Sequence, residues 1–393
     1  MTLPLEGLLV VTVEQAVAAP FASRQLADLG ARVIKIERPG TGDFARSYDA
    51  TVKGLASHFV WTNRSKQSLT LDLKRPEAAG VLTTLLSRAD VFLHNLAPGA
   101  MARLGFGTAS LRASHPRLIV CEISGYGTTG PYRDKKAYDL LVQSEAGVVS
   151  VTGTPDTPSK VGVSIADIAA GMYAFSSILA ALFQRQATGQ GAALDISMFD
   201  SLAEWMGYPA YYAMYTGTPP ERSGASHSTI APYGPYAAGD GKTVFIGLQN
   251  DREWERFCVE VLEQPDLLRD PRFGSNADRV AHRAALDALI TSAFAGRPAA
   301  DVAARLDAAH IANARMNTVS EFLDHPQLAA RDRWREVDSP AGPIRALVPP
   351  FGIRGVEPRM EKIPAVGEHT EAILGELGID SSTIADWREA GII

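Results

Sequence analysis

The first half of the chain alternates short apolar runs with segments of helical pattern, and this alternation limits the possible folds more than any other feature. Residues 8–13 form an almost unbroken Leu/Val run, which is typical of a strand buried on both faces. The pattern predicts helices at residues 20–29, 76–88 and 99–104, and further strands at residues 32–37, 68–73, 90–93 and 118–123. Strand–helix alternation with short links predicts an α/β protein with a doubly wound parallel sheet.

The chain changes in character after a long apolar helix. The pattern over residues 167–187 is apolar nearly all round, so we expect this helix to be central and buried. The Gly-, Pro- and Ser-rich stretch at residues 216–228 indicates a linker or a mobile loop. A second, largely helical unit is expected to follow, starting with a strand at residues 243–248.

Composition and charge exclude several classes of protein. The 393 residues are 46% hydrophobic and 21% charged, an ordinary globular mix that can bury a sizeable core. A formal net charge of −6 argues against a broad nucleic-acid-binding surface, but it leaves room for a small basic pocket for one anionic ligand. The two cysteines, Cys121 and Cys258, fit neither a disulfide framework nor a CxxC metal motif, so we expect buried free thiols in a reducing compartment.

The sequence predicts neither a targeting segment nor a membrane span. Residues 1–6 lack the basic and apolar regions of a secretory signal. The longest apolar stretch, residues 165–183, is interrupted by Asp167, Ser176 and Ser177, which favours a buried helix over a membrane span. We therefore expect a cytoplasmic protein that does not bind membranes.

Two short motifs resemble known sites but lack part of the usual context. Residues 125–130 read G-x-G-x-x-G after a predicted strand, but no apolar helix follows to supply the amides of a dinucleotide site. Ser164 stands in a G-x-S-x-A stretch similar to a nucleophile elbow, and a hydrolase would need a later base from among His227, His310, His325 and His369. Both activities stay open as alternatives, and helix capping is the simpler role for Ser164.

Asp167 is the candidate reactive residue because it stands at the expected start of the most apolar helix. The structural interpretation is a helix-capping or first-turn carboxylate that interacts with the helix dipole. The functional interpretation uses the same setting. Backbone N–H groups would keep the carboxylate ionised while apolar surroundings remove its water, so that it can act as a covalent nucleophile.

Basic residues gather at the predicted strand ends and in the loops after them. They are Arg38, Arg46, Lys74, Arg75, Arg103, Lys135 and Lys136. Ligands of open α/β sheets bind at the carboxyl ends of the strands, so this set suits a polyphosphate ligand. Each residue alone is equally explained as a solvated surface charge.

Short motifs follow one another in a fixed order over nearly the whole chain. The main ones are Ala18-Ala19-Pro20-Phe21, Val33-Ile34-Lys35-Ile36-Glu37-Arg38-Pro39-Gly40, Asn95-Leu96-Ala97-Pro98-Gly99, Tyr138-Asp139, Val161-Gly162-Val163-Ser164-Ile165-Ala166-Asp167, Gly171-Met172-Tyr173 and Gly367-Glu368-His369-Thr370. In this order and spacing the chain resembles the class III coenzyme A transferases, the CaiB/BaiF family.

The resemblance implies that Asp167 is the nucleophile and that coenzyme A binds as a substrate rather than as a prosthetic group. The implied contacts to coenzyme A are Val17, Ala18, Arg38, Leu71, Lys74, Asn95, Leu96, Arg103, Lys136, Ala137, Tyr138 and Asp139. Arg38, Lys74 and Arg103 would meet the phosphates or the adenine end. No metal or redox cofactor is implied.

The implied reaction moves coenzyme A from an acyl thioester to a free carboxylic acid. Asp167 attacks the donor to form a mixed anhydride, the thiolate returns to give an aspartyl-CoA thioester, and the acceptor acid reverses these steps. An α-methylacyl-CoA racemase is one alternative, but those relatives place a histidine where this chain has Tyr138, which is a poor acid–base group near neutral pH. A non-catalytic acyl-CoA-binding protein is the other.

Two segments depart from the family pattern and bear on the substrate. Residues 226–233, which include His227, stand where members that use formyl-CoA carry a glycine run, and this argues against formyl or oxalate substrates. Residues 313–317 replace a Gly-Pro turn, and Arg315 would hold the far carboxylate of a dicarboxylic acid if it faces the site. His227 would orient the acceptor or pack against the linker, and Arg315 can equally be a surface arginine.

The resemblance also implies the architecture. A large Rossmann-like domain that binds coenzyme A would contain residues 1–200 and 335–393, with a linker at 201–225. A smaller α+β domain with a return linker would span residues 226–334. Each chain would form a ring, and two rings would interlock as a homodimer.

Overall fold

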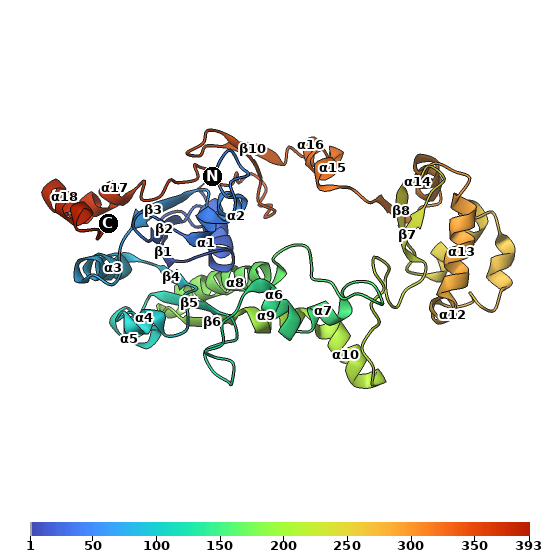
Figure 1. Ribbon diagram of the computed structural model, residues 1–393, viewed down its shortest axis with the longest axis horizontal. Coiled ribbons are helices and arrows are strands. Elements are labelled where there is room, and N and C mark those ends of the chain that lie inside the picture. Colours follow the sequence, from blue (N-terminus) through green and yellow to red (C-terminus); the bar gives the residue numbers. More distant parts are fainter. Residues whose placement is uncertain (1) are drawn as a thin grey trace. The chain divides into compact units, whose positions relative to one another are not determined.

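A computed structural model describes residues 2–393, and the chain divides into two units (Figure 1). The first unit contains Met1–Ala146, Val161–Met206 and Gln327–Ile393. The second contains Gly147–Lys160 and Gly207–Pro326. Both ends of the chain therefore belong to the first unit.

A six-stranded parallel sheet forms the centre of the first unit. Its strands are β1 (Leu9–Val13), β2 (Arg32–Glu37), β3 (Lys66–Thr70), β4 (Val91–His94), β5 (Ile119–Ser124) and β6 (Ala193–Ser197). Their order is β3-β2-β1-β4-β5-β6, and every neighbouring pair is parallel. The predicted parallel α/β sheet is confirmed. The chain order reverses between β1 and β4, which is where sheets of this kind bind ligands at the carboxyl ends of the strands.

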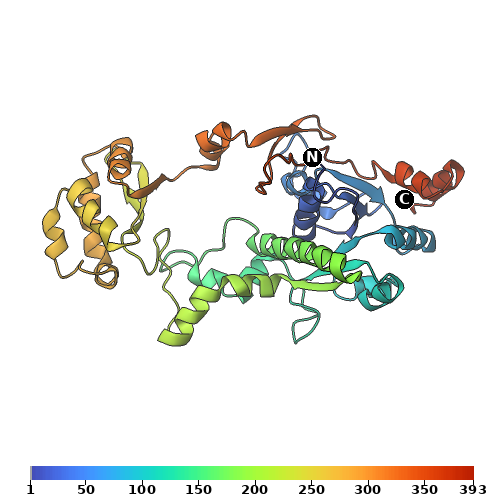
Figure 2. The same ribbon diagram turned by 180° about the vertical axis from the view of Figure 1, so that it is seen from behind.

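Helices cover both faces of this sheet. On one face α1 (Ala18–Asp28) packs against α8 (Ile165–Thr188), which Figure 2 shows as the long green helix. On the other face α3 (Pro76–Arg88), α17 (Thr370–Glu376) and α18 (Ser381–Glu389) share a core with strand residues such as Val11 and Ile34. Shorter elements of this unit are η1 (Phe44–Ser47), α2 (Ser57–Thr62), α4 (Ala100–Arg103), α5 (Thr108–Ser114), α6 (Asp139–Glu145), α9 (Met198–Trp205), β10 (Trp334–Val337) and β11 (Ile344–Leu347).

The second unit combines a small antiparallel sheet with helices. Its sheet has the order β7 (Tyr233–Ala237), β8 (Thr243–Gly247) and β9 (Ala312–Arg315). Its helices are α7 (Val148–Val151), α10 (Gly207–Thr216), α11 (Asp251–Arg256), α12 (Asn276–Ala281), α13 (Arg283–Phe294), α14 (Ala299–Ala308) and α15 (Val319–Leu323). The sequence pattern missed β7 and β9. Both are edge strands, where a proline such as Pro235 is tolerated and an apolar run is not required.

The Gly- and Pro-rich stretch expected as a linker or mobile loop is tied down by hydrogen bonds. Arg222 donates hydrogen bonds to the carbonyl oxygens of Ser150, Thr154 and Pro155. The Gly224 amide donates a hydrogen bond to the Gly153 carbonyl. These bonds explain why residues 147–160 belong to the second unit, a division that the local sequence pattern does not reveal.

The expectation that α8 is buried on all sides is wrong for one side of the helix. Ala170, Ala174 and Ile178 are buried, but Phe183 is 77% exposed within the single chain. A helix that is apolar on all sides is expected to be buried, but its sequence does not show which segment or partner buries each side. By length and composition α8 is the one helix in the described part of the chain able to cross a membrane, with mean hydropathy 1.7, and core helices meet the same test.

Gly171 sets the distance between α1 and α8. A Cβ atom at Gly171 would lie 2.7 Å from the Ala18 carbonyl oxygen and 3.0 Å from a ring carbon of Phe21. The carbonyl cannot move aside without moving the start of α1. We therefore expect Gly171→Ala to lower the free energy of unfolding by about 1–3 kcal/mol, measured by urea denaturation.

Gly80→Ala in the interior of α3 is the matched control. Nothing lies within 4 Å of a Cβ atom at Gly80, so alanine should raise the free energy of unfolding by about 0.5–1 kcal/mol through its better helix propensity. Equal effects of the two substitutions would contradict the close contact of α1 with α8.

Candidate active site

Asp139 caps the helix that carries Asp167. Ser164 occupies the N-cap position of α8, but its side chain makes no capping hydrogen bond. Instead, Oδ1 of Asp139 accepts hydrogen bonds from the backbone N–H groups of Ala166, at 2.7 Å, and Asp167, at 3.4 Å. Its Oδ2 accepts from the Gln143 side chain at 2.6 Å. The amides that were expected to stabilise Asp167 are therefore engaged by a different carboxylate.

This environment leaves Asp167 poorly solvated. Burial raises the pKa of Asp167 from its ordinary value of 3.8 to about 7, and the nearby Asp139 carboxylate is the second cause. Within residues 2–393 no group donates a hydrogen bond to the Asp167 carboxylate. The structure corrects the expectation that backbone amides keep Asp167 ionised, whereas it supports the expected loss of water. A carboxylate with few donors around it is more nucleophilic than a solvated one.

Tyr48, which the sequence analysis did not single out, lies near Asp167. Burial raises the pKa of Tyr48 to about 12, and the charges of Asp43, Asp167 and Tyr138 contribute. Tyr48 therefore keeps its proton near neutral pH and can donate a hydrogen bond beside the carboxylate. A lone aromatic residue after a short helical turn carries no sequence signal for such a role.

A cavity of about 460 Å³ opens at the carboxyl ends of β1 to β4. Four residues predicted to contact coenzyme A line it: Arg38, Leu71, Lys74 and Leu96. Its wall also contains Glu14, Gln15 and Asp43, which were not predicted. The cavity lies at the reversal of strand order, where a ligand of this type of sheet is expected.

The other predicted coenzyme A contacts lie outside the cavity lining. Val17 and Ala18 are buried at the start of α1, and Arg103 is exposed at the end of α4. Lys136, Ala137, Tyr138 and Asp139 lead into α6, where Asp139 serves as the cap of α8. Asn95 forms two hydrogen bonds with the backbone of Gln15, so its amide group holds a loop.

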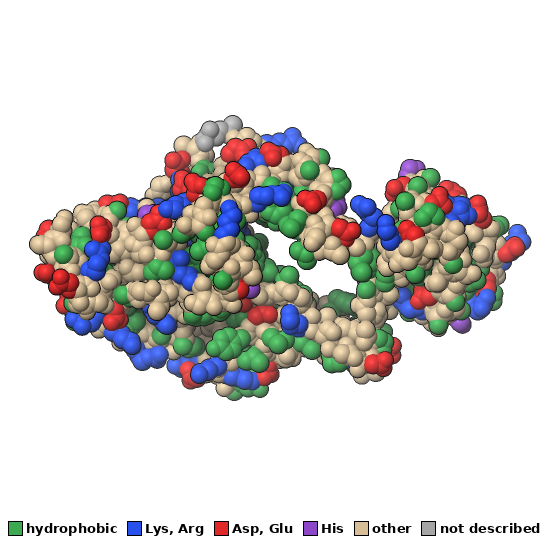
Figure 3. Space-filling view, turned by 45° about the horizontal axis from the view of Figure 1, so that its top comes forward, with side chains coloured by type: hydrophobic (Ala, Val, Ile, Leu, Met, Phe, Trp, Pro, Cys, Tyr) green, Lys and Arg blue, Asp and Glu red, His purple; other side chains and the backbone are tan. Residues whose placement is uncertain are grey.

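Some of the seven basic residues predicted at the strand ends form ion pairs with acidic side chains, and the others do not. Arg46 donates two hydrogen bonds of 2.8 Å to Glu37 and lies over the Phe59 ring, while Lys135 forms an ion pair with Glu145. Among the described residues the members without an acidic partner are Arg38, Lys74, Arg103 and Lys136. Acidic and basic side chains are interspersed over the face seen in Figure 3.

The G-x-G-x-x-G motif has a packing role. A Cβ atom at Gly125 would overlap the side chain of Ala137, so the glycine allows the segment before α6 to approach β5. Residues 131–138 contain no helix, and the donors of a dinucleotide site are missing there. The hydrolase alternative gains no support at Ser164, whose side chain makes no capping hydrogen bond, and Nδ1 of the candidate base His369 accepts a hydrogen bond from the Ser68 amide.

His227 and Arg315 both belong to the second unit. The His227 ring stacks on Tyr233 with centroids 5.3 Å apart, and its backbone carbonyl accepts a hydrogen bond of 2.7 Å from Arg283. Arg315 is exposed at the end of β9, paired in register with Val244. The packing of His227 against its own loop is the simpler of the two roles considered for it.

The cysteines agree with the sequence interpretation. Cys121 and Cys258 are buried and free, and burial raises the pKa of both thiols. No cluster of three His, Cys, Asp or Glu side chains suited to a metal ion occurs in the described part of the chain.

The comparison with known proteins agrees with this geometry. The profile of CoA-transferase family III matches residues 5–370. The chain belongs to CoA-transferase family III. An acetyl-CoA:oxalate CoA-transferase of Acetobacter aceti is 38% identical over 331 residues, which cover 84% of this chain and 85% of the relative. A succinate–glutarate CoA-transferase of Agrobacterium fabrum is 33% identical over 384 residues, covering 95% and 96%.

Solved structures lead to the same family. The crystal structure of a CaiB/BaiF family protein from Brucella suis matches with a TM-score of 0.84 and 34% identity. The match covers 96% of this chain and all of that one. The two-unit fold described above is therefore the fold of family III transferases.

The raised pKa of Asp167 predicts a pH-dependent stability for this family III transferase. Between pH 4 and 7 the unfolded chain loses the Asp167 proton while the folded chain keeps it, so the stability falls as the pH rises through this window. Asp167→Asn removes this effect. We expect the variant to exceed the wild type in free energy of unfolding by about 1–3 kcal/mol at pH 8, allowing for the partial exposure of the group.

The difference should shrink as the pH approaches 4, where the unfolded chain also begins to bind the Asp167 proton. Asp301→Asn, at an exposed carboxylate in the first turn of α14, is the matched control in the same series. Urea denaturation at several pH values measures both variants. A constant difference between Asp167→Asn and the wild type would contradict the raised pKa.

Proposed function

We propose that this protein transfers coenzyme A from an acyl-CoA thioester to a free carboxylic acid through a covalent intermediate on Asp167. The observation that carries the proposal is the desolvated Asp167 carboxylate, in the same unit as a cavity bordered by Arg38 and Lys74. Membership in a transferase family and the names of the relatives support the class of reaction.

The reaction proceeds through two kinds of intermediate. An Asp167 oxygen attacks the donor thioester carbonyl, the C–S bond breaks, and a mixed anhydride and a thiolate result. The thiolate attacks the Asp167 carbonyl, which gives an aspartyl-CoA thioester and releases the donor acid. The acceptor carboxylate then attacks the aspartyl thioester, the C–S bond breaks, and a new mixed anhydride and the thiolate result. The thiolate attacks the acyl carbon of the acceptor, which gives the new acyl-CoA and restores the Asp167 carboxylate. Apolar surroundings protect the activated species from water.

A dicarboxylic acid is the proposed acceptor. The names of the relatives include oxalate, succinate and glutarate, which are the carboxylates of dicarboxylic acids. In the second unit, Arg315 is the proposed partner of the far carboxylate, because a guanidinium group can bind a carboxylate with two hydrogen bonds.

We also propose that the active form is a homodimer of two interlocked chains. The helix α10 has no buried residue, although several of its side chains are large and apolar. Tyr211, Met214 and Tyr215 are each at least 65% exposed. Phe183 on α8 is equally uncovered. Large apolar side chains exposed on a monomer indicate an interface, and a second copy is the commonest partner.

Chemical trapping tests the covalent step. Hydroxylamine or borohydride should modify Asp167 only after an acyl-CoA has been added, and peptide mass spectrometry locates the modification. Asp167→Asn should lower the rate of transfer by at least about a thousandfold, because the nucleophile is lost, while the dissociation constant for coenzyme A changes little. Succinyl-CoA with short dicarboxylates, including oxalate, is the first set of substrates.

The matched control is Asp301→Asn, which should leave transfer unchanged. Modification without acyl-CoA, or turnover without modification at Asp167, would contradict the covalent mechanism. Exchange of the α-proton of a 2-methylacyl-CoA without transfer would instead favour the racemase. Tight binding of acyl-CoA without turnover of any pair would favour a binding protein.

The cavity predicts a second measurable property. Arg38→Ala or Lys74→Ala should each weaken coenzyme A binding by about tenfold, since a charge-assisted contact to phosphate is lost. The loss should be smaller at high salt. Arg88→Ala, at the amino-terminal edge of the sheet, is the matched control in calorimetry. Equal affinities for all three variants would place the phosphates elsewhere.

A further inference from the structure

The loop between β1 and α1 contains a residue in an unfavourable backbone conformation. Ala16 has φ +62°, in the left-handed region that residues with a Cβ atom rarely adopt. The methyl side chain of alanine offers no hydrogen bond to compensate. Such conformations persist only where neighbouring groups determine them, and they cluster at functional sites.

Two side chains from other segments bind this loop by hydrogen bonds. Asn95, at the end of β4, accepts a hydrogen bond of 2.9 Å from the Gln15 amide and donates one of 2.8 Å to the Gln15 carbonyl. Asp43, in the segment after β2, accepts a hydrogen bond of 3.2 Å from the Ala16 amide. The strained residue is thus fixed by a carboxamide and a carboxylate from two other segments.

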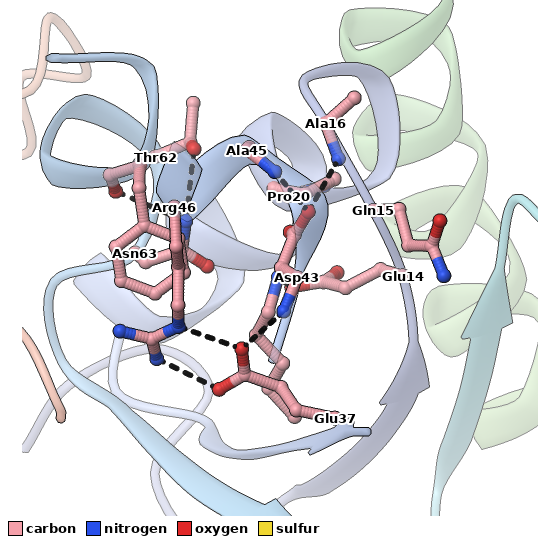
Figure 4. A network of polar contacts seen from close by, with 12 residues as sticks. Glu14, Gln15, Ala16, Pro20, Glu37, Asp43, Ala45, Arg46, Thr62 and Asn63 are labelled. Atoms are coloured by element: carbon pink, nitrogen blue, oxygen red, sulfur yellow. Dashed lines mark hydrogen bonds and ion pairs between the residues drawn. The ribbon is translucent and has the colours of Figure 1, made fainter. Parts of the chain in front are cut away.

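Asp43 is itself held rigidly (Figure 4). Its Oδ2 accepts a hydrogen bond of 2.7 Å from the fully buried Lys35, and its Oδ1 also accepts one of 2.9 Å from the Ala45 amide. The Asp43 amide donates a hydrogen bond of 2.8 Å to Glu37, which Arg46 binds in turn. Every oxygen of the Asp43 carboxylate therefore has a fixed donor.

The loop and Asp43 both border the surroundings of Asp167. Ala18 begins α1, and its carbonyl oxygen closely approaches Gly171, one turn beyond Asp167 on α8. The short helix η1 begins next to Asp43 and leads to Tyr48, whose pKa responds to the charge of Asp167. One carboxylate thus fixes two segments that flank the candidate nucleophile. Glu14, Gln15 and Asp43 also line the cavity.

We propose that Asp43 and Asn95 are positioning residues of the transfer reaction, because they hold Ala16 in its left-handed conformation and so fix the backbone of residues 15–18 beside Asp167. This inference rests on the proposed function. The loop presents its backbone to the acyl thioester, and Asp43 and Asn95 act only through the loop.

The test uses the fact that glycine adopts a positive φ without strain. Asp43→Asn should lower kcat for acyl transfer by about tenfold to a hundredfold, since small displacements of reacting groups have effects of this size. The dissociation constant for coenzyme A should stay within about threefold. Adding Ala16→Gly to Asp43→Asn should restore at least about fivefold in kcat, because glycine keeps the loop conformation without the carboxylate. Ala16→Gly alone is measured as the reference for the double variant.

Lys53→Gly is the matched control. Lys53 has φ +54° in an exposed turn, so glycine relieves the same kind of strain outside the site. Combined with Asp43→Asn it should restore no activity. If Asp43→Asn fails to fold, Asn95→Asp takes its place in the same series of variants. This substitution removes the side-chain N–H group that donates a hydrogen bond to the Gln15 carbonyl.

Two results would overturn the inference. One is an unchanged kcat in both Asp43→Asn and Asn95→Asp. The other is a lowered kcat that Ala16→Gly leaves untouched, which would assign Asp43 to stability alone. In both cases the wild type transfers coenzyme A normally. A wild type that transfers nothing from any donor to any acceptor would instead mean that the proposed function is wrong, and the inference would fall with it.

Discussion

The hydrogen bonds from the Ala166 and Asp167 amides to Asp139 determine the character of the site. A helix N-terminus normally stabilises a carboxylate in its first turn, because free amides and the helix dipole favour negative charge. Here those amides donate their hydrogen bonds to Asp139. The Asp167 carboxylate is therefore buried without hydrogen-bond donors, and its pKa rises to about 7. The close contact of Gly171 with Ala18 brings the start of α1 to the turn of α8 that follows Asp167. Reactivity at Asp167 thus depends on a neighbouring carboxylate and on a glycine.

Local patterns in the sequence predicted much of the first unit. The parallel sheet follows from buried apolar runs separated by helices, and α3 has the bounds that its periodicity predicts, because Pro76 and the following charged residues mark its ends clearly. The location of Asp167 in the first turn of α8 was also predictable, since the helix is long and strongly apolar. The reversal of strand order, which positions the cavity, then follows from the sheet's topology.

Contacts between distant segments were beyond the reach of such patterns. Asp139 and Ala166 are 27 positions apart, and Gln15 and Asn95 are 80 apart, so no periodicity signals either hydrogen bond. Arg46 looked like a phosphate ligand by its position, but Glu37 lies close enough to bind its guanidinium group. For the same reason Arg222 joins residues 147–160 to the second unit without a local signal. The side of α8 that carries exposed Phe183 shows a second limit of sequence patterns. An apolar side chain predicts that a surface will be buried, but it does not identify the segment or partner that buries it.

Oxygen transfer into Asp167 tests the central claim most directly. An acceptor acid labelled with ¹⁸O in its carboxylate is mixed with the protein and an unlabelled acyl-CoA donor, and the Asp167 peptide is then analysed by mass spectrometry. The proposed mechanism predicts that one labelled oxygen passes from the acceptor to the Asp167 carboxylate, and in the next turnover to the released donor acid. Formation of the new acyl-CoA over many turnovers with an unlabelled Asp167 would contradict it.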